Sequence, residues 1–154
     1  MDDNEFAVRI EKLRKRLYRT AILYMHSEQS ALDVIDETVY KGLVALKKLR
    51  QPEYFETWIT RILINECKKE LRRRKREAPL DTLPETAGET FDSLPLKEAI
   101  RRLPVELKEI IILRYFSDLT LAQTAQSLSI PQGTVVTRQR RAMNLLRLEL
   151  SEEE

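Results

Sequence analysis

The chain has 154 residues, which suffices for one ordinary domain or two very small ones. With 42% hydrophobic and 34% charged residues but only 3 glycines, the composition argues against sheets with tight hairpins and favours helices with thin cores and long charged faces. The formal net charge of +2 by itself predicts no partner, so any charged surface must come from the distribution of charge along the chain.

The first half of the chain shows apolar residues at every third or fourth position, which is the spacing of one helix face. The first predicted helix carries Phe6, Ile10, Leu13, Leu17, Ala21 and Tyr24 on that face, and the second carries Ala31, Val34, Ile35, Thr38, Val39, Gly42, Leu46 and Leu49. We expect Pro52 to close the second helix and to open a third, with Phe55, Ile59, Ile62, Leu63 and Leu71 on its apolar face. We also expect Cys67 in the core. These helices predict a bundle that forms a first module, residues 1–76.

A stretch rich in proline, small and acidic residues follows at 77–94 and predicts a flexible linker. Helical periodicity then returns in a predicted second module, residues 95–154. Its first helix carries Leu96, Ile100 and Leu103, and its second, opened by Pro104, carries Leu107, Ile110, Ile111 and Tyr115. Two more helices are predicted on either side of a break at Ser129–Pro131. The whole chain is therefore predicted to be all-α, with two small helical modules joined by a linker.

The segment 121–141 has the pattern of a helix-turn-helix. Ala125 is small where two helices must approach closely, Thr120 can cap the first helix, and Ser129 can cap the second with Pro131 in its first turn. We expect the second helix to turn Val135, Ala142 and Leu145 inward. The residues left facing a major groove are Val136, Thr137, Arg140, Arg141 and Asn144. A plain helical hairpin with a charged face is the alternative.

The third helix carries Arg61, Asn65, Lys68 and Arg72 on one face, at spacings of four, three and four residues. Tyr54, Phe55 and Trp58 lie at its start, and the run KKELRRRKR (68–76) ends it. Cations bind phosphates, an amide can contact a base edge, and aromatic rings can stack on unpaired bases, so this combination indicates single-stranded DNA. We expect Phe55 to be core and leave Trp58 open. The second helix presents Asp33, Glu37, Tyr40 and Val44 outward, which indicates either a protein-docking surface or a solvated face.

Together these segments resemble the extracytoplasmic-function sigma factors, the smallest of the sigma-70 class. SALDVIDETVYKGLVALKKL (30–49) is similar to region 2.2, FETWITRILINECKKELRRRKR (55–76) to region 2.4, and 103–146 to region 4. The ordered pair F-x-x-W-I-x-R-I and I-P-x-G-T-V-x-T-R carries the resemblance. It implies a transcription initiation factor that binds core RNA polymerase, recognises the −10 and −35 promoter elements and promotes strand opening.

The resemblance also implies roles for individual residues. Docking on the clamp helices of the polymerase β′ subunit is implied for Asp33, Glu37 and Tyr40. Binding of the −10 element as its strands separate is implied for Trp58, Arg61, Asn65, Lys68 and Arg72. Binding of the −35 major groove is implied for Thr134, Thr137, Arg138, Arg140 and Arg141. Region 4 would also pack on the β flap, and the resemblance implies an anti-sigma factor that covers the polymerase-binding faces.

The chain departs from the family pattern at four places, one of which is Gln139 and Arg140, where the family usually has an apolar residue and a histidine. Val136 stands where the family usually has Lys or Arg, Ser129 replaces a glycine common in the turn, and the loop before Phe55 is shorter than usual. A left-handed backbone conformation at position 129 would be more strained for serine than for glycine.

Two other classes of function stay open from the sequence alone. One is a dimeric helix-turn-helix regulator that acts without polymerase, for which the sequence supplies no clear zipper. The other is an adaptor that binds only proteins.

We expect no catalytic activity, because the sequence has no glycine-rich phosphate loop and suggests no nucleophile–base pair. The single cysteine and the single histidine argue against a zinc site, so we also expect no metal and no cofactor. With no signal-peptide pattern at MDDNEFAVRI and no long apolar run, we expect a cytoplasmic protein.

Overall fold

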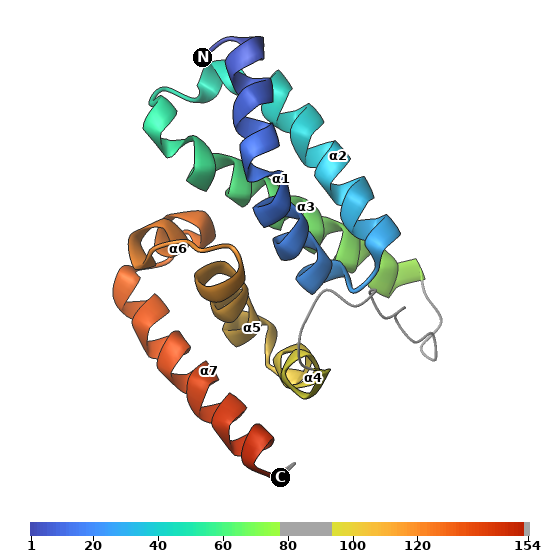
Figure 1. The fold of residues 1–154 in the computed structure, drawn as a ribbon, viewed down its shortest axis with the longest axis vertical. Coiled ribbons are helices and arrows are strands. Elements are labelled where there is room, and N and C mark those ends of the chain that lie inside the picture. Colours follow the sequence, from blue (N-terminus) through green and yellow to red (C-terminus); the bar gives the residue numbers. More distant parts are fainter. Residues whose placement is uncertain (78–93, 153–154) are drawn as a thin grey trace. The chain divides into compact units, whose positions relative to one another are not determined.

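The computed structural model describes residues 1–77 and 94–152, and all regular structure in these two ranges is helical (Figure 1). This confirms the all-α prediction. The helices group into two compact units, which we describe separately. The predicted linker lies outside the described residues, apart from its two end residues, Glu77 in α3 and Leu94 in α4. None of the helices in the described ranges has the length and apolar character needed to cross a membrane.

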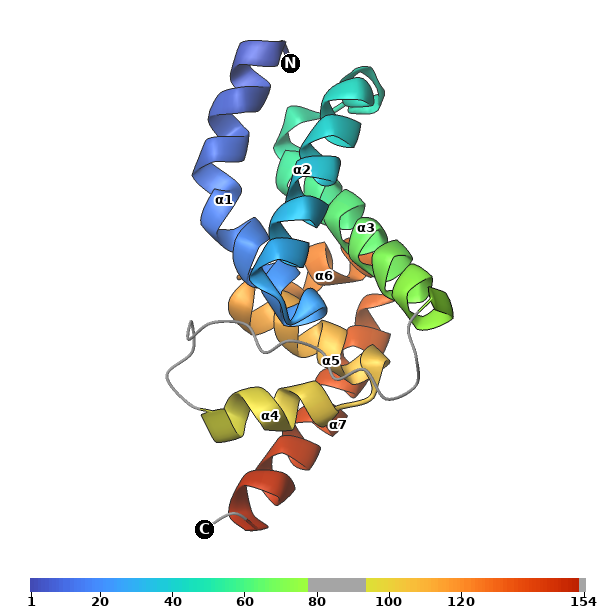
Figure 2. The ribbon, with the colours of Figure 1, turned by 90° about the vertical axis from the view of Figure 1, so that its right-hand side faces the viewer.

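The first unit contains α1 (Asp3–Met25), α2 (Glu28–Val44) and α3 (Phe55–Glu77), with two short 3-10 turns, η1 (Leu46–Lys48) and η2 (Pro52–Tyr54), between α2 and α3. Figures 1 and 2 show α1 and α2 side by side, and α3 packs against both. The Asp2 carboxylate caps α1 by accepting from the Glu5 amide at 2.8 Å, and the Ser27 hydroxyl caps α2. Each of these two helices is therefore preceded by a residue whose side chain accepts from one of its free amides.

The core of the first unit uses the apolar faces that the sequence predicts. Its buried residues include Phe6, Ile10, Leu17, Ala21, Tyr24, Ala31, Val34, Ile35, Phe55, Ile59, Leu63 and Cys67. Phe55 and Cys67 are thus core residues as expected. Burial raises the pKa of the Cys67 thiol, which keeps it protonated.

The second helix is shorter than predicted. It ends at Val44 instead of continuing to Pro52, and Leu46 is buried from a 3-10 turn. Apolar residues three apart fit a 3-10 turn as well as an α-helix, so the periodicity alone did not reveal the change. Pro52 opens η2, which leads directly into α3.

The second unit contains α4 (Leu94–Arg102), α5 (Val105–Ile111), a π-helical turn η3 (Ile112–Phe116), α6 (Leu121–Leu128) and α7 (Gln132–Glu152). The long helix α7 packs against α4, α5 and α6. One core cluster joins α4, α5 and α7 through Ile100, Leu103, Leu107, Ala142 and Leu146. A second joins α5, α6 and α7 through Ile110, Ala125 and Val135. Ala125 therefore lies at the helix crossing, as predicted.

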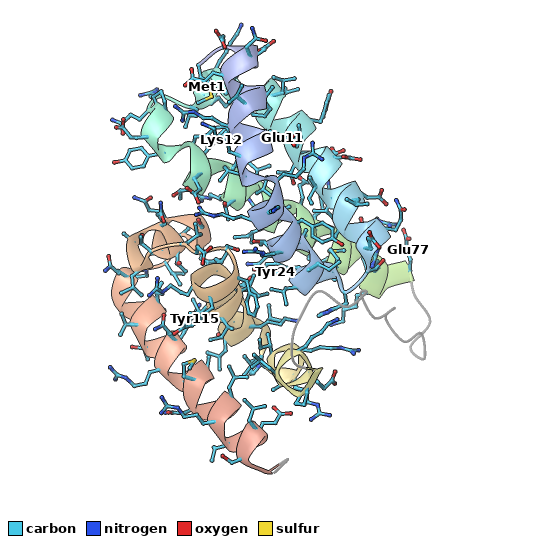
Figure 3. All side chains as sticks on the ribbon, viewed as in Figure 1. Met1, Glu11, Lys12, Tyr24, Glu77 and Tyr115 are labelled. Carbon is cyan, nitrogen blue, oxygen red and sulfur yellow. The ribbon has the colours of Figure 1, made fainter. Side chains whose placement is uncertain are left out.

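Four predictions for the second unit are wrong, the first of them Leu96, which is exposed instead of facing the core with Ile100 and Leu103. Ser129 does not cap α7; it ends α6 in a left-handed conformation, with φ of 58°. Tyr115, labelled in Figure 3, is 49% exposed, because the π-helical turn shifts the helix phase there and packs Phe116 inward. Leu145 is exposed, and Leu146 takes the inward position. Thr120 does cap α6 in a capping box: its hydroxyl accepts from the Gln123 backbone amide, and its own backbone amide donates to the Gln123 side-chain oxygen.

Candidate nucleic-acid interface

Helix α7 has one face fixed in the core and the opposite face open. Val135 and Ala142 are fully buried, and this sets the phase of the helix. Thr137, Arg140 and Arg141 are exposed on the other side, as predicted. The Thr137 hydroxyl donates to the Gly133 carbonyl at 3.1 Å. Neither arginine contacts a carboxylate within the described ranges, so both guanidinium groups are available to an external acceptor.

Thr134 and Arg138, also predicted to face DNA, lie on the flank of α7 and are half-buried. An Arg138 Nη2 atom lies 3.8 Å from an Oε2 atom of Glu106 at the start of α5. This ion pair draws Arg138 toward α5 and away from the open face. The structure thus groups three of the five predicted residues on one open face and sets two at its edge. Asn144, which the helical spacing also predicted to face a major groove, is exposed on the same open face.

Arg114 holds the helix-turn-helix together from inside the unit. Its Nε donates to the Gln139 amide oxygen at 3.0 Å, and its Nη1 donates to the Leu119 carbonyl at 2.6 Å. These bonds tie α7 to the loop before α6. Arg114 is therefore a positioning residue for the open face of α7, although it does not lie on that face.

The outward face of α3 carries Arg61, Asn65 and Arg72, which are exposed, with Lys68 half-buried among them. We call these four residues the α3 stripe. Within the described residues, no carboxylate pairs with Arg61 or Arg72, and the Asn65 amide has no hydrogen-bond partner. The stripe can therefore bind phosphates and offer an amide to a base edge. Lys69 is exposed beside it, one turn after Asn65, and helical spacing alone would have found it.

The aromatic residues at the start of α3 differ in exposure. Phe55 is buried, makes an edge contact with Phe6 and lies below Arg9, whose guanidinium carbon is 5.7 Å from the ring centre. Trp58 is half-buried against Phe55, with ring centres 6.0 Å apart. Tyr54 is 47% exposed. Tyr54 thus offers the most open of these three rings for stacking on a base.

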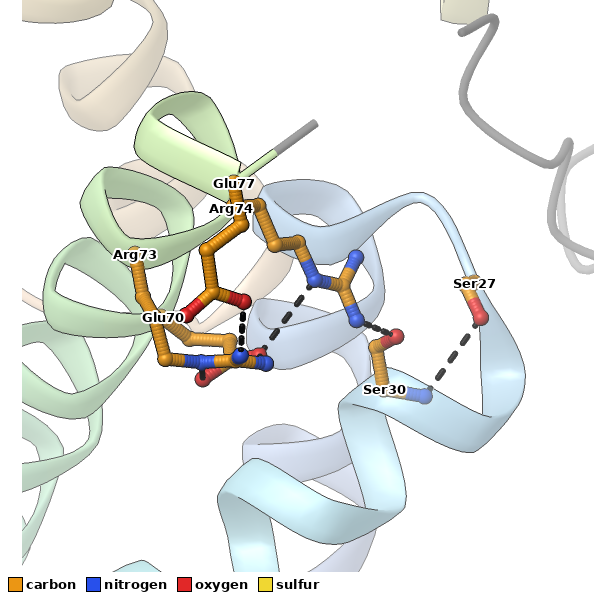
Figure 4. Close-up of polar contacts among 6 residues, drawn as sticks. All are labelled: Ser27, Ser30, Glu70, Arg73, Arg74 and Glu77. Atoms are coloured by element: carbon orange, nitrogen blue, oxygen red, sulfur yellow. Dashed lines mark hydrogen bonds and ion pairs between the residues drawn. The ribbon is translucent and has the colours of Figure 1, made fainter. Parts of the chain in front are cut away.

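The basic end of α3 is less available to phosphates than its sequence indicates. Figure 4 shows Glu70 bound by both Arg73 and Arg74, while Arg74 also donates to the Ser30 hydroxyl of α2. Arg73 reaches Glu77 as well, at 2.7 Å. The hydrogen bond from Arg73 holds the pKa of the Glu70 carboxyl below its ordinary value, so this carboxylate stays charged. Arg74 therefore ties α3 to α2, while Arg73 is paired with two carboxylates of its own helix.

The outward face of α2 carries the predicted acidic residues. Asp33 accepts from the Gln29 amide at 2.9 Å, and Glu37 lies 3.9 Å from Lys41. Both are exposed, and Tyr40 is 64% exposed. Val44, also predicted to face outward, is exposed, and the face extends to three exposed neighbours that the spacing did not predict: Leu32, Asp36 and Leu43. An acidic face with this much open apolar surface favours docking of a basic, partly apolar protein surface.

Comparison with known families matches both units. The model of sigma-70 region 2 matches residues 9–77, and the model of sigma-70 region 4 matches residues 99–148. The RNA polymerase sigma factor SigV of Bacillus subtilis is 32% identical over 146 residues, which cover 92% of this chain and 88% of that protein. The sigma factor SigW of the same organism is 25% identical and covers 97% of this chain and 90% of its own length.

Two solved structures share the fold. The sigma factor RpoE of Bartonella quintana, in complex with the anti-sigma factor NepR, has a TM-score of 0.82 at 22% identity, with 97% of this chain and 99% of that chain covered. CnrH, in complex with the cytosolic domain of CnrY, has a TM-score of 0.77 at 17% identity, with 99% of this chain and 92% of that chain covered.

The matches to the two sigma-70 family models exclude both alternative functions. A simple helix-turn-helix regulator would match region 4 alone, and an adaptor would match neither model.

Proposed function

This chain belongs to the sigma-70 family, in its extracytoplasmic-function group, and we propose how its described surfaces divide the work of transcription initiation. As an alternative sigma factor, it binds core RNA polymerase and directs it to promoters. We assign the −10 element to the α3 stripe with Tyr54 and Trp58. The −35 element falls to the open face of α7, with Arg140 and Arg141 as its main cations.

The observation that carries this division is the Asn65 amide, which has no partner among the described residues and lies within a cationic stripe on the helix whose start carries the exposed Tyr54 and the half-buried Trp58. A protein that reads only duplex DNA gains little from aromatic rings at that point. A protein that holds a melted strand gains from stacking together with a basic track. This supports a role for α3 in strand opening.

Polymerase docking on the β′ clamp helices is assigned to the outward face of α2, through Asp33, Glu37 and Tyr40. Its carboxylates and open apolar side chains support a partner that is basic and partly apolar. The second unit would meet the β flap. We further propose that an anti-sigma factor covers these faces and that the protein acts in the cytoplasm with the polymerase. Residues 1–76 and 95–154 form the two working modules in this proposal.

Strand opening tests the assignment of α3. Promoters are first identified by sequencing the transcripts that the holoenzyme makes from genomic DNA of the source bacterium. Permanganate reactivity of thymines around the −10 element then reports unpaired bases in holoenzyme carrying Asn65→Ala. We expect reduced opening with near-normal core binding and −35 binding, because those contacts lie on other helices.

The matched control is Asn4→Ala, an exposed asparagine near the start of α1 with no assigned role. It should open promoters like the parent protein. Circular dichroism checks that both variants keep their helix content. Normal opening by folded Asn65→Ala protein would remove the base-reading role of this residue, and a wild-type holoenzyme that opened no promoter would overturn the whole assignment.

A further inference from the structure

Gly133 stands at the N-terminal end of the open face of α7. It is the second residue of the helix, and its spacing to Thr137, Arg140 and Asn144 is four, seven and eleven, so it lies in line with them. A Cβ atom added at Gly133 would meet no atom of the described chain within 4 Å. The packing of the protein therefore leaves open space where this residue has no side chain.

Gly42 shows the opposite situation within the same chain. A Cβ atom there would lie 2.6 Å from Cδ1 of the fully buried Ile59 and 3.3 Å from the Phe6 ring, so a side chain at this position would force the core to shift. Packing within the protein accounts for the absence of a side chain at Gly42, but it does not account for the absence of one at Gly133.

Backbone conformation does not explain Gly133 either. It lacks the left-handed φ that favours glycine. Within a helix, alanine is the better residue, because glycine loses more conformational freedom on folding. The isolated protein would thus be at least as stable with alanine at this position.

We propose that Gly133 is a specificity-determining position, at which the backbone of α7 approaches the −35 DNA too closely to leave room for a side chain. The inference rests on the proposed function of α7 as the −35 reading helix. A recognition helix places its N-terminal residues against the base edges, so the missing side chain lies where insertion is deepest. A side chain there would lift Thr137 and Arg140 away from the bases.

The test compares Gly133→Ala, Gly133→Leu and Arg141→Ala in holoenzyme, on duplexes that carry a matched or a mutated −35 element. We expect Gly133→Ala to keep or raise the melting temperature of the free protein and to weaken matched-site binding by about tenfold, the size of one good base contact. Gly133→Leu should weaken it further. Binding to the mutated site should change little, because phosphate contacts tolerate a shallower helix. Gly42→Ala is the contrasting control and should lower the melting temperature.

Each outcome decides one point. If Gly133→Ala binds the matched site as tightly as the parent while Arg141→Ala binds it weakly, the inference about Gly133 is wrong and the proposed function of α7 stands. If the parent holoenzyme does not distinguish matched from mutated sites, the proposed function of α7 fails and the inference fails with it. A lower melting temperature for Gly133→Ala would contradict the open space on which the inference rests.

Discussion

Arg141 and Arg138 lie one turn apart on α7, and alanine substitution should separate their roles. Arg141 is exposed and has no carboxylate partner within the described ranges, so its loss should cost the fold less than about 0.5 kcal/mol. If it contacts a base in bidentate fashion, Arg141→Ala should cost roughly 1–3 kcal/mol of promoter affinity, or roughly 5- to 150-fold. Arg138 is 27% exposed and its partner Glu106 is 73% exposed. Such a screened pair contributes about 0–1 kcal/mol, so Arg138→Ala should change folding and DNA binding only slightly.

The assay measures holoenzyme binding to promoters with matched and mutated −35 elements at two salt concentrations. A base contact predicts a loss confined to the matched site. A phosphate contact predicts a uniform loss and a shallower salt dependence. Arg147→Ala, an exposed arginine further along α7, is the control. No loss on any site would remove Arg141 from the interface, and a larger loss for Arg138→Ala would show that α7 meets DNA with a different face.

Two further predictions concern α2 and the turn before α7. Asp33→Lys combined with Glu37→Lys should weaken core polymerase binding by roughly tenfold while leaving the melting temperature nearly unchanged, because both side chains are exposed; unchanged affinity would mean that polymerase docks elsewhere. Ser129→Gly should raise the free energy of unfolding by about 0.5–1 kcal/mol in urea titration, because a left-handed residue with a Cβ atom is strained. Ser129→Ala keeps that atom and should give no gain, so an equal gain from both would rule out relief of this strain as the cause.

Helix locations could be predicted from the sequence because each core face repeats regularly and prolines mark three of the breaks, before α3, α5 and α7. The failures lie where the backbone leaves the α-helical repeat. At η3 the Ser117 amide bonds to the Ile112 carbonyl at 2.9 Å, a five-residue step that turns Tyr115 outward. The repeat of 3.6 residues that guided the prediction does not hold in such a turn.

Which residues of the candidate site are exposed could be predicted from helix phase alone, but which side chains form ion pairs and hydrogen bonds could not. Spacing alone put Arg61, Asn65 and Arg72 on one face, and all three are exposed. Spacing could not show that Arg73 and Arg74 bind Glu70, since that depends on rotamers and on Ser30 in another helix. Nor could it decide between Leu145 and Leu146, because both fit the helical repeat on α7 and only packing against α4 selects one.

Both proposed DNA surfaces lie on a long helix whose opposite face is locked in a core. Ile59 and Leu63 fix α3, and Val135 and Ala142 fix α7. The direction in which the outward side chains point is thus set by apolar packing, and a rigid element holds a contact surface more accurately than a loop. A core change that rotates either helix would therefore reduce DNA binding without touching a DNA-facing residue. Substituting the outward side chains of such a helix changes the free energy of unfolding little, so one scaffold can recognise different promoter sequences.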